Sequence, residues 1–299
     1  MRRPLPTMKT RRIMTATTGQ SIMTFHLASK PFPAASAGQA LPGARMRAGL
    51  LACGLLLVPA APARAQVSAA PATSAPAAPT APGAAFSAGT PGGPLPAGWK
   101  NLPVAHGKTL TRYSLVTDNS ATVLQADAAA SASALMHKGN VDLGETPQLT
   151  WRWKIERPID DADNSVASKE DAPARLVFMF EGDKSKLPLG ERAAIQLAKT
   201  LAGEELPYAT LMYVWSNTAP VGSVIDNPHT SRVKMIVVSG GADGVGKWLA
   251  LSRNVAQDYE HAFHEKPGKV AAYGLLTDTD NTGASAHAWY GDIRFGPAK

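Results

Sequence analysis

The amino-acid sequence predicts a mostly-β domain, an antiparallel β-sandwich with one or two inserted helices. Short runs of β-branched, aromatic and aliphatic residues recur along the later two thirds of the chain, separated by glycine, proline, asparagine or aspartate. In residues 147–156 (PQLTWRWKIE), apolar and basic side chains alternate with a period of two, as in a strand with one buried face. Helical segments are too few to connect parallel strands, which disfavours a doubly wound α/β fold.

The elements follow one another with short turns between them. The clearest strand places Trp151 and Trp153 on one side and Arg152 and Lys154 on the other. Residues 189–207 combine a helical apolar stripe with a glycine near its end, and residues 255–265 are a second, shorter helical segment. The predicted strands occupy residues 111–118, 121–139, 147–156, 174–183, 209–217, 232–241, 247–255, 269–278 and 285–295.

The charge of the chain is unevenly distributed. Nine of the 30 Lys and Arg residues lie in residues 1–65, which contain no Asp or Glu, so the remaining 21 face all 23 acidic residues. The formal charge of +7 therefore belongs to the N-terminal segment. A nucleic-acid partner needs a basic patch on the folded part, so none is expected.

The N-terminal segment has the features of a secretory signal. Two arginines precede the apolar run AGLLACGLLLV, and Ala63-Arg64-Ala65 offers small residues at a cleavage site after Ala65. Residues 46–65 are therefore predicted to be a cleaved signal peptide, and residues 1–45 an over-long start. The apolar run is too short to span a bilayer, so no membrane span is expected in the mature protein. The single cysteine, Cys53, is removed by this cleavage, which excludes disulfides and thiolate chemistry.

Two further segments complete the predicted organisation. Residues 66–94 consist of uncharged Ala, Pro, Ser, Thr and Gly with few apolar side chains, and are predicted to be a disordered linker. Residues 95–299 form the predicted β-sandwich domain, whose length suits one large β domain.

Several motifs, taken in order, resemble an uncharacterised family of secreted bacterial proteins, the family of domain of unknown function 3047. They are LTWRWKIE, ARLVFMFEGD, LGERAAIQLAKTLAGEELPYATLMYVWSN, NPHTSRVKMIVV and LLTDTDNTGASAHAWYGDI. The resemblance covers residues 95–297 and implies no established activity.

A looser resemblance connects the domain with jelly-roll carbohydrate-binding modules. The opening GW, the central PQLTWRWKI and the closing AWYGDIRF are similar to the first, middle and last strands of such modules. The resemblance implies a jelly-roll sandwich that binds carbohydrate. In those modules an aspartate of the closing aromatic-Asp-Asp-Ile strand contributes to a structural calcium site, and this chain has Gly291-Asp292 there.

The segment 275–295 raises the question of a calcium site directly. Asp278 and Asp280 have the spacing of the first two ligands of an EF-hand loop, but the twelfth position is Trp289 instead of glutamate, which excludes an EF-hand. A calcium site of another design remains open, with Asp278, Asp280 and Asp292 as ligands. The alternative is a turn in which Asp and Asn cap their own backbone and Gly283 adopts a positive φ.

Aromatic and polar residues near the loops are the candidate ligand contacts. Most aromatic rings are expected to fill the core, because they bury a large area. The rings that adjoin polar loops are the candidates for stacking on a sugar. The predicted ligand-binding residues are Trp215, Asn217, Asp278, Asp280, Asn281, Trp289 and Tyr290.

Three functions remain open from the sequence. The leading hypothesis is a non-catalytic protein that binds a carbohydrate or cell-envelope glycan in the periplasm or outside the cell. The second is a polysaccharide lyase or glycoside hydrolase, in which His229, Arg232 and a carboxylate of the final loop would act on an acidic sugar. The third is a structural envelope protein without a small ligand. Fold-level analogy alone does not decide among them.

Overall fold

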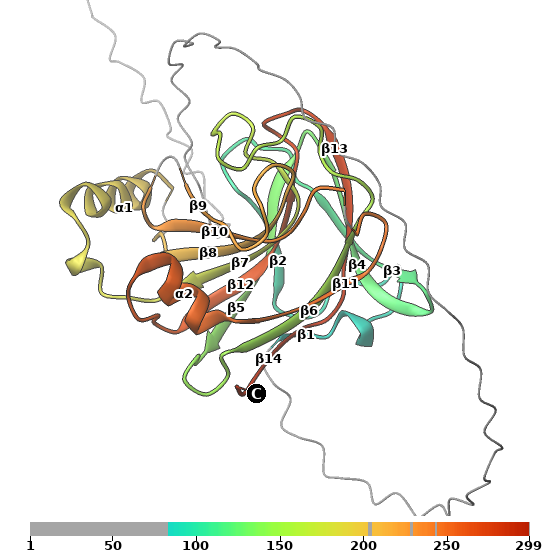
Figure 1. Ribbon diagram of the computed structural model, residues 1–299, viewed down its shortest axis with the longest axis horizontal. Coiled ribbons are helices and arrows are strands. Elements are labelled where there is room, and N and C mark those ends of the chain that lie inside the picture. The colour runs from blue at the N-terminus through green and yellow to red at the C-terminus, as the bar shows by residue number, and fades with distance from the viewer. Residues whose placement is uncertain (1–82, 203–204, 228–229, 243, 299) are drawn as a thin grey trace, which may run out of the picture. The chain divides into compact units, whose positions relative to one another are not determined.

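The computed structural model describes residues 83–298, apart from 203–204, 228–229 and 243. The predicted over-long start, the signal peptide and residues 66–82 of the predicted linker lie outside the described residues. The described chain forms two seven-stranded sheets that pack face to face, so the predicted β-sandwich with inserted helices is confirmed (Figure 1). None of the described helices is long and apolar enough to cross a bilayer.

The first sheet, sheet A, is organised around strand β6. β6 pairs with β11 along one edge and with β13 and β14 in succession along the other. β4 and β3 continue the sheet beyond β13, and β1 pairs with β14. The strands of sheet A are β1 (Gly83–Ala84), β3 (Arg112–Asp118), β4 (Ala121–Ala129), β6 (Gln148–Ile155), β11 (Leu249–Asn254), β13 (Ser285–Tyr290) and β14 (Ile293–Gly296).

The second sheet, sheet B, has the strand order β2-β5-β12-β7-β8-β10-β9. Its pairings are antiparallel except that of β8 with β10, which is parallel. The purely antiparallel arrangement expected from the sequence is therefore wrong for this pair, because the short β9 returns the chain before β10. The strands of sheet B are β2 (Trp99–Pro103), β5 (Ala132–Val141), β7 (Ala172–Phe180), β8 (Ala209–Ser216), β9 (Val224–Asp226), β10 (Val233–Gly240) and β12 (Val270–Asp278).

The main core lies between the two sheets and is rich in aromatic rings. Trp151 of β6 stacks on Tyr213 of β8, with ring centroids 5.3 Å apart and planes 6° apart. The indole N–H of the neighbouring Trp153 donates to Ser239 Oγ at 3.0 Å. The predicted inward orientation of Trp151 and Trp153 is therefore confirmed, and both side chains connect sheet A to sheet B.

Within the described residues, two helices and two short 3-10 turns interrupt the strands. α2 (Val255–Phe263) buries Val255, Tyr259 and Ala262 in the core, and Asn254 caps it by accepting from Gln257 N at 3.1 Å. α1 (Leu189–Ala202) follows the 3-10 turn η2 (Lys184–Lys186) and is largely exposed. α2 therefore stabilises one end of the sandwich, whereas α1 adds little to its core.

The domain begins earlier than the sequence predicted. β1 and the 3-10 turn η1 (Phe86–Ala88) lie within residues 83–94, which were assigned to the linker. Phe86 is fully buried, and its ring lies 5.3 Å from that of Trp99. The linker assignment is wrong for this stretch, because a single phenylalanine supplies the apolar surface that the surrounding Ala, Pro and Gly residues lack.

The outer face of sheet B carries a second apolar cluster, separate from the main core. β5, β7, β8 and β10 each contribute alternate side chains to it, so both faces of these strands are apolar. Four of its members are methionines, namely Met136, Met179, Met212 and Met235. The continuous apolar runs of β7 and β8 are explained by this second cluster, since strands with two covered faces lose the period of two.

We predict that Phe86→Ala lowers the free energy of unfolding by about 3–5 kcal/mol, because it empties a fully buried aromatic site. Urea unfolding followed by tryptophan fluorescence measures this change. Leu189→Ala is the control, since Leu189 is 80% exposed and its replacement is expected to change stability by no more than about 0.5 kcal/mol. Equal stability of Phe86→Ala and the parent protein would show that residues 83–94 are not part of the folded unit.

Candidate functional site

Two of the predicted stacking rings lie in the core. Trp215 is fully buried, and Tyr290 is 1% exposed with its hydroxyl 2.8 Å from Thr277 Oγ1. Neither ring is available to a ligand, so both assignments are wrong. The cause for Trp215 is its position on β8, whose alternation places it on the same inner face as Tyr213.

Of the three aspartates predicted to bind calcium, Asp292 lies apart from Asp278 and Asp280. Asp278 ends β12, whereas Asp292 follows β13, and the six residues of β13 separate the two by roughly 20 Å. Asp292 instead accepts hydrogen bonds from Ser87 N at 2.9 Å and Ser87 Oγ at 2.7 Å. The inclusion of Asp292 in that metal site is therefore wrong, and its carboxylate fixes η1 to the end of sheet A.

The residues predicted to act together in catalysis also lie far apart. Arg232 forms an ion pair with Glu265 at 2.6 Å and donates to Tyr208 O at 3.0 Å. These contacts lie where β7 ends, whereas Asp278 pairs with the first residue of β7, roughly 27 Å along the strand. Arg232 therefore cannot act together with a carboxylate of the final loop. His229 lies outside the described residues.

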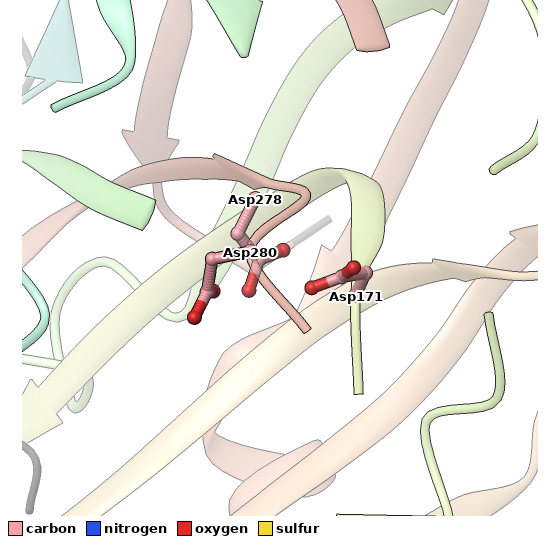
Figure 2. A group of neighbouring side chains, drawn as sticks. All are labelled: Asp171, Asp278 and Asp280. Carbon is pink, nitrogen blue, oxygen red and sulfur yellow. The ribbon is translucent and has the colours of Figure 1, made fainter. Parts of the chain in front are cut away.

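Acidic side chains gather at the other end of sheet B. Asp171 immediately precedes β7 and meets Asp278 and Asp280, with one oxygen of each within 4.8 Å of the others (Figure 2). Asp171 was not among the residues predicted from the sequence. The signal for it is the pairing of β7 with β12, which brings the start of one strand beside the end of the other.

Asp171 holds the loop between β12 and β13 in place. Its Oδ1 accepts from Asn281 N at 3.1 Å, and its Oδ2 accepts from Thr282 N at 2.7 Å and from Thr282 Oγ1 at 2.6 Å. The side chain of Asn281 donates to Ala167 O at 2.8 Å. Gly283 has a φ of 71°, so the predicted turn is confirmed. Its backbone is capped by Asp171, which directly precedes β7, and not by the turn's own Asp and Asn side chains.

The other two carboxylates have protein donors as well. Asp278 Oδ1 accepts from Ala172 N at 3.0 Å, and its Oδ2 lies 3.4 Å from an Arg175 nitrogen. Asp280 forms an ion pair with Lys108. Burial raises the pKa of Asp278 to about 7, although Arg175 lowers it. A calcium ion at this position would have to displace Lys108 and compete with Arg175, so the arrangement fits a structural ion network better than a calcium site.

The outer face of sheet A carries aromatic rings that contact solvent. Trp289 of β13 and Trp248, which directly precedes β11, are both half-buried, and the outward-facing Lys154 of β6 lies between them. The Lys154 ammonium is 4.4 Å from the Trp289 ring centre and 5.3 Å from that of Trp248. Arg152 lies over the Trp248 ring at 4.5 Å. We call these four residues, together with Asp118, the outer tryptophan cluster.

Hydrogen bonds fix both rings of the outer tryptophan cluster. The Trp248 indole N–H donates to Asp118 Oδ2 at 2.5 Å, and the Trp289 indole N–H donates to Gln125 Oε1 at 3.1 Å. Lys154 donates to both oxygens of Asp118 at 2.9 Å, and this contact is the main cause of the lowered pKa of Asp118. The two rings are therefore held in one orientation by their hydrogen bonds.

A charged row lies beside this cluster on the same face. Asp127 of β4 accepts from His287 Nδ1 and from Gln125 Nε2, each at 2.7 Å. Its other oxygen accepts from Arg112 at 2.7 Å. Among the predicted contacts, Trp289 thus faces solvent on sheet A, whereas Asn217 lies elsewhere and donates to Ile159 O. Trp248, Asp118 and Asp127 were not among the residues predicted from the sequence.

Comparisons with known proteins concern the whole domain. Residues 97–294 match the model of a family described as "Protein of unknown function (DUF3047)", so the family expected from the motifs is confirmed. No curated protein matches the chain in sequence.

Solved structures similar to this chain share little sequence with it. Endoglucanase 3 of Trichoderma harzianum, from family GH12, has a TM-score of 0.34 and 10% identity, covering 63% of this chain and 84% of its own. The xyloglucanase domain of NopAA, a type three effector from Sinorhizobium fredii in complex with cellobiose, has a TM-score of 0.37 and 6% identity, covering 67% and 91%. Similarity at this level identifies no shared site residue.

We predict that Asp278→Asn becomes more stabilising as the pH rises. The folded protein holds the Asp278 proton up to a pKa of about 7, whereas an unfolded chain releases it near pH 4. Between about pH 4 and 7 the unfolded chain is therefore stabilised by ionising this carboxyl while the folded protein keeps it protonated, and the folded protein loses stability by about 1.4 kcal/mol per pH unit at most. Urea unfolding of both proteins across this range measures the difference. A difference that does not change with pH would contradict the assignment.

We predict that EDTA leaves the melting temperature of the protein unchanged, because Lys108 and Arg175 already pair with Asp280 and Asp278, and Asn281 and Thr282 donate to Asp171. Differential scanning calorimetry in metal-free buffer, with and without added calcium, tests this. A fall in melting temperature that calcium restores and magnesium does not, and that Asp171→Asn abolishes, would instead establish a calcium site here.

Proposed function

Since the chain belongs to the DUF3047 family, whose description assigns no activity, we propose from its own geometry that it is a non-catalytic carbohydrate-binding protein. In this proposal the outer tryptophan cluster is the binding site. The observation that carries it is the pair of half-buried indoles, Trp248 and Trp289, held on a rigid sheet face with Lys154 between them.

Rings of this kind suit the apolar faces of sugar rings. A large aromatic surface that is fixed in advance loses little conformational entropy when a ligand stacks on it. Trp289 pairs with Lys154, and Trp248 directly precedes Leu249, which pairs with Trp153, so the two indoles flank Lys154 and the sheet backbone holds their spacing. A glycan chain lying along this row would place successive sugar units over the two rings.

Polar groups next to the rings support the same ligand class. Sugar hydroxyls both donate and accept hydrogen bonds, so a glycan site needs carboxylates, amides and cations close to the stacking surface. Asp118, Gln125 and Lys154 provide one of each around the two rings. His287 is 42% exposed at its side chain and extends the polar surface beyond Trp289.

Binding is favoured over catalysis by the separation of the predicted catalytic groups. Arg232 is engaged with Glu265 at one end of sheet B, and the carboxylates of the final loop lie at the other end. On the outer face of sheet A, Asp118 and Asp127 each form an ion pair with a basic side chain, which suits a structural role. The proposal also includes export, through the signal expected at residues 46–65, and an envelope or extracellular glycan as ligand.

We predict that Trp289→Ala and Trp248→Ala each weaken glycan binding by about tenfold or more, because each removes one stacking ring. A glycan array identifies the ligand, and calorimetric titration with it measures the change. Val221→Ala is the matched control, since Val221 is 66% exposed in a loop outside the cluster and its loss is expected to leave binding unchanged.

Melting temperatures of the variants distinguish loss of the site from loss of the fold. Unchanged glycan binding by both folded tryptophan variants would contradict the site. A parent protein that binds no glycan on the array would favour the structural envelope role instead.

A further inference from the structure

The outer face of sheet B contains an apolar cavity of about 220 Å³. It opens across four adjacent strands, β2, β5, β12 and β7, on the side away from sheet A. Its apolar wall consists of Leu102, Met136, Met179 and Ala272, which belong to or border the second apolar cluster. The cavity is therefore independent of the outer tryptophan cluster, which lies on the opposite sheet.

A small residue at the middle of the wall makes room for the cavity. Ala272 pairs with Lys138 of β5 on one side and with Met179 of β7 on the other. The methyl group of Ala272 lies between longer side chains, so the sheet surface is hollow there. Methionine side chains at such a surface adapt to aliphatic ligands of different shape, because they are unbranched and polarisable.

The edge of the cavity is cationic. Lys100 of β2 and Lys138 of β5 line it and are exposed, and neither has an ion pair within the described part of the chain. His137 also lines it, but its ring packs between those of Trp99 and Tyr273 on the side of the main core. No carboxylate is among the lining residues. The combination of an apolar wall and a positive edge is complementary to a molecule with an aliphatic tail and a negative head.

We propose that this cavity binds a free aliphatic monocarboxylate of about eight carbons, with its tail against Met136, Met179 and Ala272 and its head at Lys100 and Lys138. The size of the tail follows from the volume, which equals about seven water-sized volumes and therefore suits a chain of seven or eight carbons. Burial of the tail supplies the affinity, and the two ammonium groups select the anionic head.

Calorimetric titration with sodium octanoate tests the proposal. We expect saturable binding at millimolar concentration or below, and binding at least about tenfold weaker for octyl glucoside, which has the same tail and a neutral head. Acetate, which lacks the tail, is expected not to bind. Absence of saturable octanoate binding, or equal binding of octyl glucoside, would overturn the proposal.

Two variants test whether octanoate binds in this cavity. Ala272→Leu fills the hollow, and Lys100→Gln with Lys138→Gln removes the positive edge without touching the core; each is expected to weaken octanoate binding by about tenfold. Lys186→Gln with Lys266→Gln is the matched control, since these lysines are 78% and 84% exposed at their side chains and lie outside the cavity. Binding that survives Ala272→Leu in a protein of normal melting temperature would overturn the proposal.

An anionic membrane also presents aliphatic tails with negative headgroups, so it is the competing ligand. Vesicles of zwitterionic lipid with and without an anionic lipid separate the two, because a free carboxylate site does not sediment the protein with vesicles. Co-sedimentation with anionic vesicles, lost in the double lysine variant and without octanoate binding, would overturn the proposal in favour of a lipid surface.

Discussion

The alternation of side chains along β6 is the constraint on which the rest of the structure depends. Trp151 and Trp153 point inward, where one indole stacks on Tyr213 of the opposite sheet and the other donates to Ser239. β6 also pairs with β11, β13 and β14, so three segments distant in sequence take their register from it. A one-residue slip of β6 would exchange its two faces and break the packing between the sheets.

The outward residues of the same strand organise the candidate site. Lys154 lies between Trp248 and Trp289 because β11 and β13 flank β6 at that position. Arg152 reaches the Trp248 ring across Gly291, where any larger residue would meet its side chain. The packing between the sheets and the surface site are therefore two consequences of one strand, and a change in either face acts on the other through the backbone they share.

The sequence predicted those parts of the fold where one face of a strand is polar. In β6 the alternation is visible, and the directions of Trp151 and Lys154 are as expected. β8 has apolar residues on both faces, so nothing in its sequence indicates that Trp215 points inward. Trp248 and Asp171 were missed for a different reason, because their neighbours are set by strand pairings between distant segments, which one sequence does not reveal.

The hydrogen bonds of the two half-buried indoles restrict how the proposed glycan site would discriminate between ligands. Asp118 and Gln125 already accept hydrogen bonds from the two indole N–H groups. A ligand would therefore contact only the carbon atoms of the rings and could not accept hydrogen bonds from them. Selectivity at the rings would then depend on shape, namely on how flat the ligand's apolar faces are and how they are spaced. A glycan site of the proposed kind would tolerate changes of linkage and substituent at the ligand's periphery and would reject ligands that cannot lie flat.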